Sequence, residues 1–253
     1  MKLINKYDLY AKALDLRKRL GQDMMSPIDV FSVSLTIDRI TLVFYPMGEH
    51  ISGMCIKNNG YPIIAINSSM SVGRQRFSMA HELYHLYFDE SEEIRVCAIQ
   101  IDSGNEIEKA ANLFASYFLM PPHAFNEMIR KLCNNSSRNL GIKEIVFLEQ
   151  YFGVSRQALL FRLVEDNILS TEQANQFREG VILSAVSMGY EDSLYRPLPK
   201  NRQYKTYGYY INKAEELLKK GLISSGKYEE LLLSAFRPDL VYGYQLEGGE
   251  LND

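Results

Sequence analysis

The chain has 253 residues, a net charge of −3, 46% hydrophobic residues and 23% charged residues. This composition is that of an ordinary globular protein with room for one large domain or two small ones, and it excludes a general electrostatic attraction to nucleic acid or membranes. The sequence contains no apolar run of membrane-spanning length and no apolar secretory signal after Met1, and its three cysteines are scattered, so a reducing, cytoplasmic location is expected.

The first elements predicted along the chain are one helix and three strands. Residues 6–20 place Leu9, Ala13 and Leu16 on one face of an amphipathic helix. Three β-rich runs follow at residues 39–44, 51–56 and 61–67. Glycine-containing turns separate these runs, and the simplest arrangement is therefore an antiparallel meander.

The next predicted helix, at about residues 71–88, carries the sequence His81-Glu82-Leu83-Tyr84-His85. On a helix, residues four apart lie on the same face, separated by roughly 6 Å along the axis. His81 and His85 can therefore bind one Zn²⁺ from the same side, and Glu82 is placed to act as a base on a metal-bound water. Coincidence is the competing interpretation, but the apolar stripe around the motif would bury Glu82, which is unfavourable unless a metal-bound water is its partner.

A catalytic zinc needs a third protein ligand, and a second predicted helix at about residues 104–119 offers one. Glu108 lies beside the apolar stripe of this helix, whereas Glu106 points away from Glu108. Glu108 has two interpretations: a metal ligand that faces the first helix, or a solvated carboxylate favoured at a helix start. Cys97 and Cys133 have two interpretations, a metal ligand or a small buried apolar residue, and the lack of C-x-x-C spacing favours the second.

Two sequence blocks together resemble the ImmA/IrrE family of metallopeptidases. The first is R-Q-R-F-S-M-A-H-E-L-Y-H-L at residues 74–86, and the second is E-x-x-A-N-x-F-A-x-x-x-L-M-P at residues 108–121. The resemblance implies that Glu82 is the catalytic residue. It also implies that the metal ligands are His81, His85 and Glu108.

Two positions depart from the family's usual pattern. Tyr84 stands where the family often has glycine, and Asp89 stands where a further histidine is frequent. Neither position is a predicted ligand. Asp89 has two interpretations, a carboxylate that orients the ring of His85 four residues earlier, or a solvated charge at the helix end.

The expected fold class is α+β, with a small antiparallel sheet packed on the active-site helix in a zincin-like core. The predicted domains are this core at residues 1–125, a mainly helical region with a helix–turn–helix-like pattern at 126–182, and a tyrosine-rich, partly basic C-terminal module at 183–253. The second helix of the pattern, at 156–164, carries only Arg156 and Arg162 as cations, which is few for binding phosphates. The pattern is therefore interpreted as a structural joint, and direct binding to nucleic acid is not expected.

The C-terminal module is basic over residues 193–220, which contain seven Lys or Arg residues but only two glutamates. Five tyrosines lie among them in the sequence. Two interpretations stay open. The basic face is either solvated or a surface that binds a partner, because tyrosine and arginine are favoured at protein interfaces and tyrosine also stacks on single-stranded bases.

The function predicted from these residues is that of a zinc metalloendopeptidase with one metal ion per chain. The resemblance implies a specific protein as substrate or partner, namely a helix–turn–helix repressor or antitoxin encoded nearby, often in a phage-like or mobile element. Mn²⁺ or Fe²⁺ fits two histidines and one carboxylate as well as Zn²⁺ does. The alternative is a non-proteolytic regulator or toxin-like binding protein in which the metal is structural, and a peptidase scaffold with another hydrolytic substrate is a third possibility.

Overall fold

The structure is a computed structural model that describes residues 4–90, 94–98, 105–133 and 140–243. The strands are β1 (Thr41–Tyr45), β2 (Ile51–Ile56), β3 (Ile63–Asn67), β4 (Ile94–Ala98) and β5 (Lys205–Gly208). The helices of the first half are α1 (Lys6–Arg19), α2 (Val30–Ser34), α3 (Val72–Phe88), α4 (Glu106–Leu119) and α5 (Pro122–Leu132). Those of the second half are α6 (Ile142–Phe152), α7 (Arg156–Glu165), α8 (Thr171–Gln176), α9 (Val181–Val186), α10 (Tyr209–Lys219), α11 (Ser225–Ser234) and α12 (Pro238–Tyr242).

The described strands form one five-stranded sheet in the order β4-β2-β3-β1-β5, so the α+β class is confirmed. The sheet is mixed rather than wholly antiparallel, because β1 pairs with β3 in parallel while the other neighbours are antiparallel. The predicted meander of the first three strands is therefore wrong in one step. The short turn at Asn58–Gly60 joins β2 and β3 as a hairpin. The link before β2, residues 46–50, instead carries that strand to the far side of β3, which the apolar pattern of the strands does not specify.

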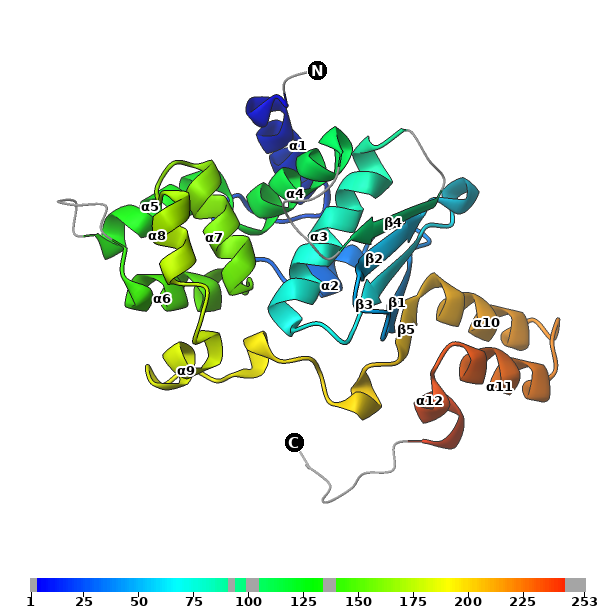
Figure 1. Cartoon of the computed structure of the whole chain (residues 1–253). Helices are drawn as coiled ribbons and strands as arrows, with labels where there is room; N and C mark the ends of the chain where they lie inside the picture. The colour runs from blue at the N-terminus through cyan, green and yellow to red at the C-terminus, as the bar shows by residue number, and fades with distance from the viewer. Residues whose placement is uncertain (1–3, 91–93, 99–104, 134–139, 244–253) are drawn as a thin grey trace.

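Helix α3 is the central element of the fold, and Figure 1 shows it between the sheet and α4. Its observed bounds agree with the predicted helix at 71–88. Phe77, Ala80 and Leu83 of α3 are buried in the main core, which stabilises the helix through apolar area removed from water. Phe114 and Phe118 of α4 stack on each other with ring centroids 5.8 Å apart in the same core. The core thereby fixes α3 and α4 side by side.

The helical region continues this core. Gly153 ends α6 in the left-handed conformation (φ 63°), and the Ser155 side chain accepts a hydrogen bond from the Ala158 amide at the start of α7, as the sequence pattern predicts. Both cations of α7, Arg156 and Arg162, are buried and bonded to protein groups. Apolar side chains from α1 through α8 belong to one buried cluster.

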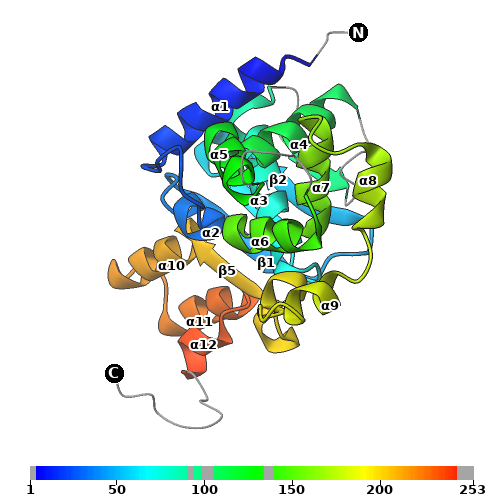
Figure 2. The same cartoon turned by 90° about the vertical axis from the view of Figure 1, so that its left-hand side faces the viewer.

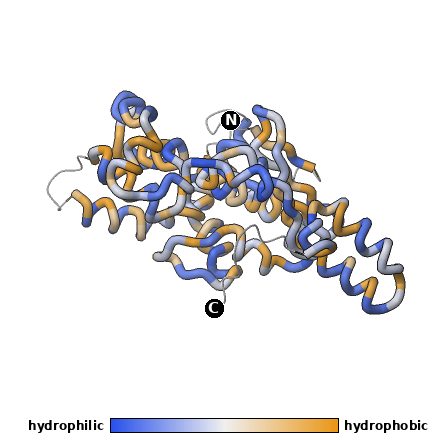
Figure 3. The backbone as a smooth tube through the Cα atoms, turned by 90° about the horizontal axis from the view of Figure 1, so that it is seen from below, coloured by the Kyte–Doolittle hydropathy of each residue, from blue (hydrophilic) through white to orange (hydrophobic). Residues whose placement is uncertain are grey.

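The C-terminal part contributes the last strand of the sheet. Strand β5 pairs antiparallel with β1, and Gly208 at its end has φ 85° in a position where a Cβ atom would lie 2.4 Å from the Ile40 carbonyl oxygen. Figures 1 and 2 both place α10–α12 beside β5 and apart from α5–α8. Figure 3 shows hydrophilic and hydrophobic positions alternating along the projecting pair α10 and α11. The division of the chain at 125 and 182 stays a prediction.

Every helix in the described part of the chain is too short or too polar to span a lipid bilayer.

Candidate metal centre

The two histidines of α3 and one glutamate of α4 converge on a common point. His81 and His85 are one turn apart, both are buried, and their Nε2 atoms are 3.0 Å from each other. Glu108 approaches from α4, with Oε2 3.2 Å from His81 Nε2 and Oε1 3.5 Å from His85 Nε2. Glu106, two residues earlier, is exposed. The position of Glu108 therefore agrees with the first of its two interpretations, in which the carboxylate faces the first helix.

The start of α4 explains why Glu108 is held there. Asn105 caps the helix, because its Oδ1 accepts hydrogen bonds from the amides of Ile107 and Glu108 at 3.0 and 3.1 Å. Glu108 is thus in the first turn, whose backbone is fixed by the cap while its side chain reaches toward α3. A carboxylate in this position is also favoured by the helix dipole.

Each histidine is oriented by a hydrogen bond to its other ring nitrogen. His81 Nδ1 is 2.8 Å from Asn112 Oδ1 on α4, and His85 Nδ1 is 3.0 Å from Asp89 Oδ2. Asp89 is buried and also accepts a hydrogen bond from Arg95 at 3.0 Å. These acceptors place the proton of each neutral imidazole on Nδ1 and leave the Nε2 lone pairs directed inward. Of the two interpretations of Asp89, the ring-orienting one is confirmed.

Glu82 is completely buried beside this point. Its Oε2 accepts a hydrogen bond from Cys97 Sγ at 3.4 Å, whereas Oε1 has no hydrogen-bond partner among the described residues. Gly53 on β2 makes room for this carboxylate, since a Cβ atom there would lie 2.7 Å from Glu82 Oε1. A buried carboxylate oxygen without a donor is unfavourable unless a ligand or a proton completes it.

The electrostatics of the metal-free centre follow from burial and from the charges within it. Burial raises the pKa of Glu82 to about 7, while burial and the charge of His81 lower the pKa of His85 to about 4. Burial lowers the pKa of His81, but its hydrogen bond to Glu108 and the charge of Glu82 outweigh burial and leave the pKa above its ordinary value. Burial raises the pKa of Glu108, and the hydrogen bond and charge of His81 reverse this into a net lowering. The pKa of His81 is thus coupled to both carboxylates of the centre.

Cys97 is a fourth donor that the sequence interpretation did not favour. Its Sγ belongs to a cluster with one ligand atom each from His81, His85 and Glu108, and these four atoms lie within 4.8 Å of one another. The side chain is buried on β4, so the prediction of a buried cysteine is right, but its neighbours are polar groups of the centre as well as apolar ones. Its position in the sequence gives no signal of this role, because its spacing from the histidines follows no metal-binding pattern.

Two other residues of the centre carry signals that sequence reasoning left unused. Asn112 lies four residues after Glu108 and hence on the same face of α4, where it reaches His81. Gly53 lies inside a strand pattern, where glycine often marks the close approach of another group. Both are understood only once α3 is placed against the sheet and α4.

The donor set suits a divalent metal ion. Two imidazole nitrogens and one carboxylate oxygen are the protein ligands of several catalytic zinc sites, and the ring-orienting contacts of Asn112 and Asp89 are typical of such sites. Oε1 of Glu82, buried and without a partner among the described residues, is the kind of oxygen that a ligand of the centre would complete. The residues present therefore fit a metal ion with Glu82 beside it.

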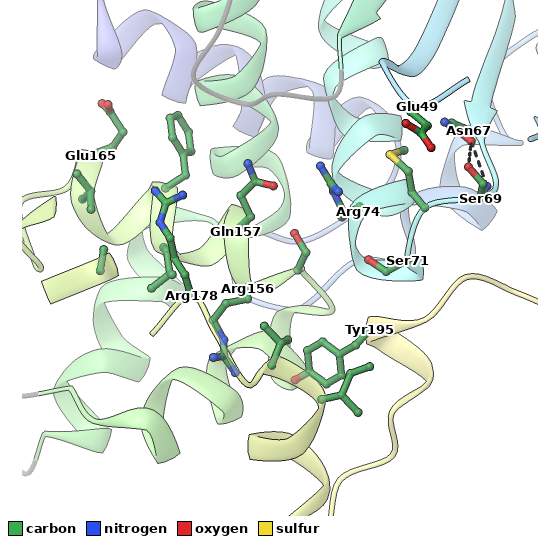
Figure 4. Close-up of a pocket in the computed structure, with 18 of the residues that line it drawn as sticks. Glu49, Asn67, Ser69, Ser71, Arg74, Arg156, Gln157, Glu165, Arg178 and Tyr195 are labelled. Atoms are coloured by element: carbon green, nitrogen blue, oxygen red, sulfur yellow. Dashed lines mark hydrogen bonds between the residues drawn. The ribbon is translucent and has the colours of Figure 1, made fainter. Parts of the chain in front are cut away.

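A separate cavity of about 810 Å³ lies at the other end of α3, between that helix and α7. Figure 4 shows polar side chains from both helices in it, including Arg74 and Gln157. None of the four donors of the cluster lines this cavity. Acidic and basic side chains both line it, so charge selects no class of ligand for it. The charged lining residues are Glu49, Arg74, Arg156, Glu165 and Arg178.

Comparison with known proteins finds a peptidase family whose matched segment includes this centre. Residues 39–164 match the model of a peptidase family described as the IrrE N-terminal-like domain. The chain is also 27% identical over 107 residues to the radiation response metalloprotease IrrE of Deinococcus deserti, an alignment that covers 41% of this chain and 37% of that protein. The match thus spans little more than a third of the length of that relative. The matched family segment contains α3, β4 and α4 and therefore every donor of the cluster.

Proposed function

The chain belongs to the ImmA/IrrE family of metallopeptidases, and we propose that it is a zinc-dependent endopeptidase that cleaves one specific helix–turn–helix repressor or antitoxin. One observation carries the catalytic part of this proposal. The Nε2 atoms of His81 and His85 converge with the Glu108 carboxylate beside the fully buried Glu82. A structural site would have no need of a buried carboxylate that lies next to the ligands and lacks a partner.

The residues that would hold the ion are His81, His85 and Glu108. Zn²⁺, when bound, supplies a Lewis acid that polarises a carbonyl and lowers the pKa of water. Asn112 and Asp89 keep the two imidazoles in the tautomer that presents Nε2 to the ion.

Glu82 is the general base in this proposal. Its carboxylate accepts a proton from the attacking water and passes it to the amine that leaves when the peptide bond breaks. Burial disfavours the charged form of Glu82, so desolvation helps this carboxylate to accept a proton. Gly53 lets the carboxylate lie close against β2, so the strand limits how far the base can move.

Strand β4 offers a position for an extended substrate. It is at one edge of the sheet, pairs with β2 on one side, and has no strand partner on its other side among the described residues. Ile94 and Val96 are exposed on it, whereas Cys97 faces the centre. A peptide that adds to this edge by main-chain hydrogen bonds would pass next to the metal ligands. Strands β2 and β3 are both internal to the sheet.

The substrate class rests on the family, whose members typically act on helix–turn–helix repressors or antitoxins encoded beside them. An edge strand that binds an extended segment, rather than an open cleft, is compatible with one preferred protein substrate.

A pair of variants tests the proposal. The adjacent reading frames are first searched for a small helix–turn–helix protein, which is then incubated with the zinc-loaded chain while intact masses are measured. Glu82→Gln should keep its zinc and lose at least about 10²-fold in cleavage rate, because the proton acceptor is gone. Glu106→Gln makes the same chemical change at an exposed position of α4 and should cleave as the wild type does. Wild-type cleavage by Glu82→Gln would contradict the proposal.

A non-proteolytic regulator with a structural metal is the second candidate, and the cysteine in the cluster favours it because structural zinc sites have four protein ligands. This candidate predicts that no peptide bond is cut by any variant. It also predicts that binding to the repressor or to DNA survives His81→Ala, with the salt dependence expected of phosphate contacts in the case of DNA.

A further inference from the structure

Cys97 is the residue of the centre whose position the proposed function does not explain. It lies on the edge strand β4, is buried, and presents Sγ to the two histidines and Glu108. Its neighbour across the strands is Gly53 of β2, which has no side chain. The sulfur can therefore reach the carboxylate of Glu82, and Sγ lies 3.4 Å from Glu82 Oε2.

The sulfur is in the right chemical setting to be a ligand. Zn²⁺ binds thiolate at about 2.3 Å as readily as imidazole at about 2.0–2.1 Å, and a thiol that coordinates it loses its proton. Four donor atoms within 4.8 Å of one another can close around one ion by small side-chain movements. The second observation is Glu82, which is fully buried beside Sγ, accepts its hydrogen bond at Oε2, and has no partner for Oε1 in the described part of the chain.

We infer that Cys97 is a fourth ligand of the metal and that the peptidase is latent while its sulfur is bound. A zinc site with four protein ligands has no open position, and catalysis requires one. The inference rests on the proposed function, because latency has a meaning only for an enzyme. It also accounts for a fourth protein donor in a peptidase site, since the site is closed in its resting state and catalytic once the sulfur leaves.

The proton of the thiol has a defined destination. When the S–H bond of Cys97 breaks, its electron pair goes to the metal ion and its proton passes to Glu82 Oε2, the hydrogen-bond acceptor of Sγ. Coordination of Cys97 therefore removes both the position for water and the free carboxylate that would act on it. Release reverses both steps, because the sulfur takes its proton back from Glu82 as it leaves.

The location of Cys97 also indicates what would release it. The strand that carries it is the edge to which an extended substrate is proposed to add. A peptide that pairs with β4 changes the hydrogen bonding and position of that strand, and a displacement of the strand moves Sγ with it. Binding of the correct segment would thereby open the site that cuts it.

The coordination is measured on the full chain loaded with Co²⁺ in place of zinc. A thiolate ligand gives an intense sulfur-to-cobalt charge-transfer band in the near ultraviolet, which histidine and carboxylate ligands do not give. The wild type should show this band, and Cys97→Ala and Cys97→Ser should lose it while still binding Co²⁺. Cys55→Ala, at a buried cysteine on the neighbouring strand, and Cys133→Ala should both keep it. X-ray absorption of the zinc-loaded wild type should give one sulfur at about 2.3 Å. A wild type without the band or the sulfur overturns the inference.

Cleavage measured on the same proteins separates this inference from the proposed function. If at least about nine-tenths of the free wild type is closed, only about a tenth is competent, so at repressor concentrations well below KM Cys97→Ala should cleave with a kcat/KM at least about tenfold higher. A wild type that cleaves the repressor but lacks the charge-transfer band supports the peptidase and overturns the closed site. A band without any cleavage, in the wild type and in Cys97→Ala alike, overturns latency together with the proposed function.

Discussion

The helical region and the metal centre both bury ionisable side chains, but they differ in whether neighbouring groups supply hydrogen-bond and charge partners for them. In the helical region the buried guanidinium of Arg156 pairs with Glu149, and Tyr195 donates to the same carboxylate at 2.8 Å while the Phe177 carbonyl accepts from Arg156 at 2.8 Å. In the metal centre two imidazole nitrogens face each other at 3.0 Å, and Glu82 has an oxygen without a donor among the described residues. A buried charged group whose neighbours supply an opposite charge and hydrogen bonds is part of the folded structure itself. A buried charged group without such partners indicates a ligand.

Arg162 shows that an unpaired atom alone does not indicate a ligand. Its Nη2 also lacks a hydrogen-bond acceptor within the described ranges. However, its guanidinium lies 4.5 Å from the ring centroid of Tyr117 and 4.8 Å from that of Phe125, and it donates to the carbonyls of Ser116 and Met120. The aromatic faces and backbone acceptors stabilise this charge without any external group. The described surroundings of Glu82 offer its Oε1 nothing comparable.

The largest expected effect on stability comes from removing one partner of the buried Arg156–Glu149 pair. Arg156→Met leaves the Glu149 carboxylate buried without its cation, and we expect the free energy of unfolding to fall by about 3–5 kcal/mol. Urea unfolding of the metal-loaded protein measures this. The double variant Arg156→Met with Glu149→Leu should recover most of the loss, because no buried charge is left unpaired. The metal dissociation constant should not change in either variant. A loss below about 1 kcal/mol would show that the pair is not what stabilises this region.

Removing the unpartnered carboxylate of Glu82 should raise the free energy of unfolding, the opposite of the effect of Arg156→Met. Because burial raises the pKa of Glu82 from 4.5 to about 7, the native state binds a proton more tightly than the unfolded state. The metal-free protein therefore loses stability as the pH rises from 4.5 through about 7. A glutamine side chain cannot ionise, so metal-free Glu82→Gln should be more stable than the wild type by up to about 3 kcal/mol above about pH 8, with little difference below about pH 4.5. Urea unfolding of chelator-treated protein at both pH values checks this, and no gain at the higher pH would show that Glu82 is already compensated.

The smallest expected effect concerns the groups that orient the imidazoles. Asp89→Asn weakens the acceptor of His85 Nδ1, and we expect metal affinity to fall by about 10–100-fold. Competition with a chromophoric chelator measures the dissociation constant. Asp38→Asn makes the same change at an exposed carboxylate and should leave the affinity unaltered. An unchanged affinity in Asp89→Asn would mean that Arg95 or the helix, rather than this carboxylate, holds the ring.

The two regions also differ in how far the sequence predicted them. The joint between α6 and α7 is encoded locally, by Gly153 and by Ser155, and the structure confirms it. The position of Glu108 was predictable in part, because helical periodicity separates it from Glu106, but its role as a ligand came from the family resemblance. The place of Cys97 in the centre was not predictable, because it depends on the pairing of β4 with β2 and on the packing of β2 against α3.

The sheet shows the same limit at a larger scale. Each of the first three strands was recognisable from its β-rich composition, and the hairpin of β2 and β3 from the turn at Asn58–Gly60. The parallel pairing of β1 with β3 was not recognisable, since alternating apolar residues fix which face is buried and not which strand lies alongside. The edge strand that the proposed mechanism uses, β4, follows from this pairing and became visible only in the fold.

Crystals of the zinc-loaded full chain, measured at the zinc absorption edge, test the central claim most directly. The account predicts one anomalous peak about 2.0–2.2 Å from His81 Nε2, His85 Nε2 and a carboxylate oxygen of Glu108. A protein that takes up no zinc, or a peak from which the Glu108 carboxylate is turned away, would contradict it.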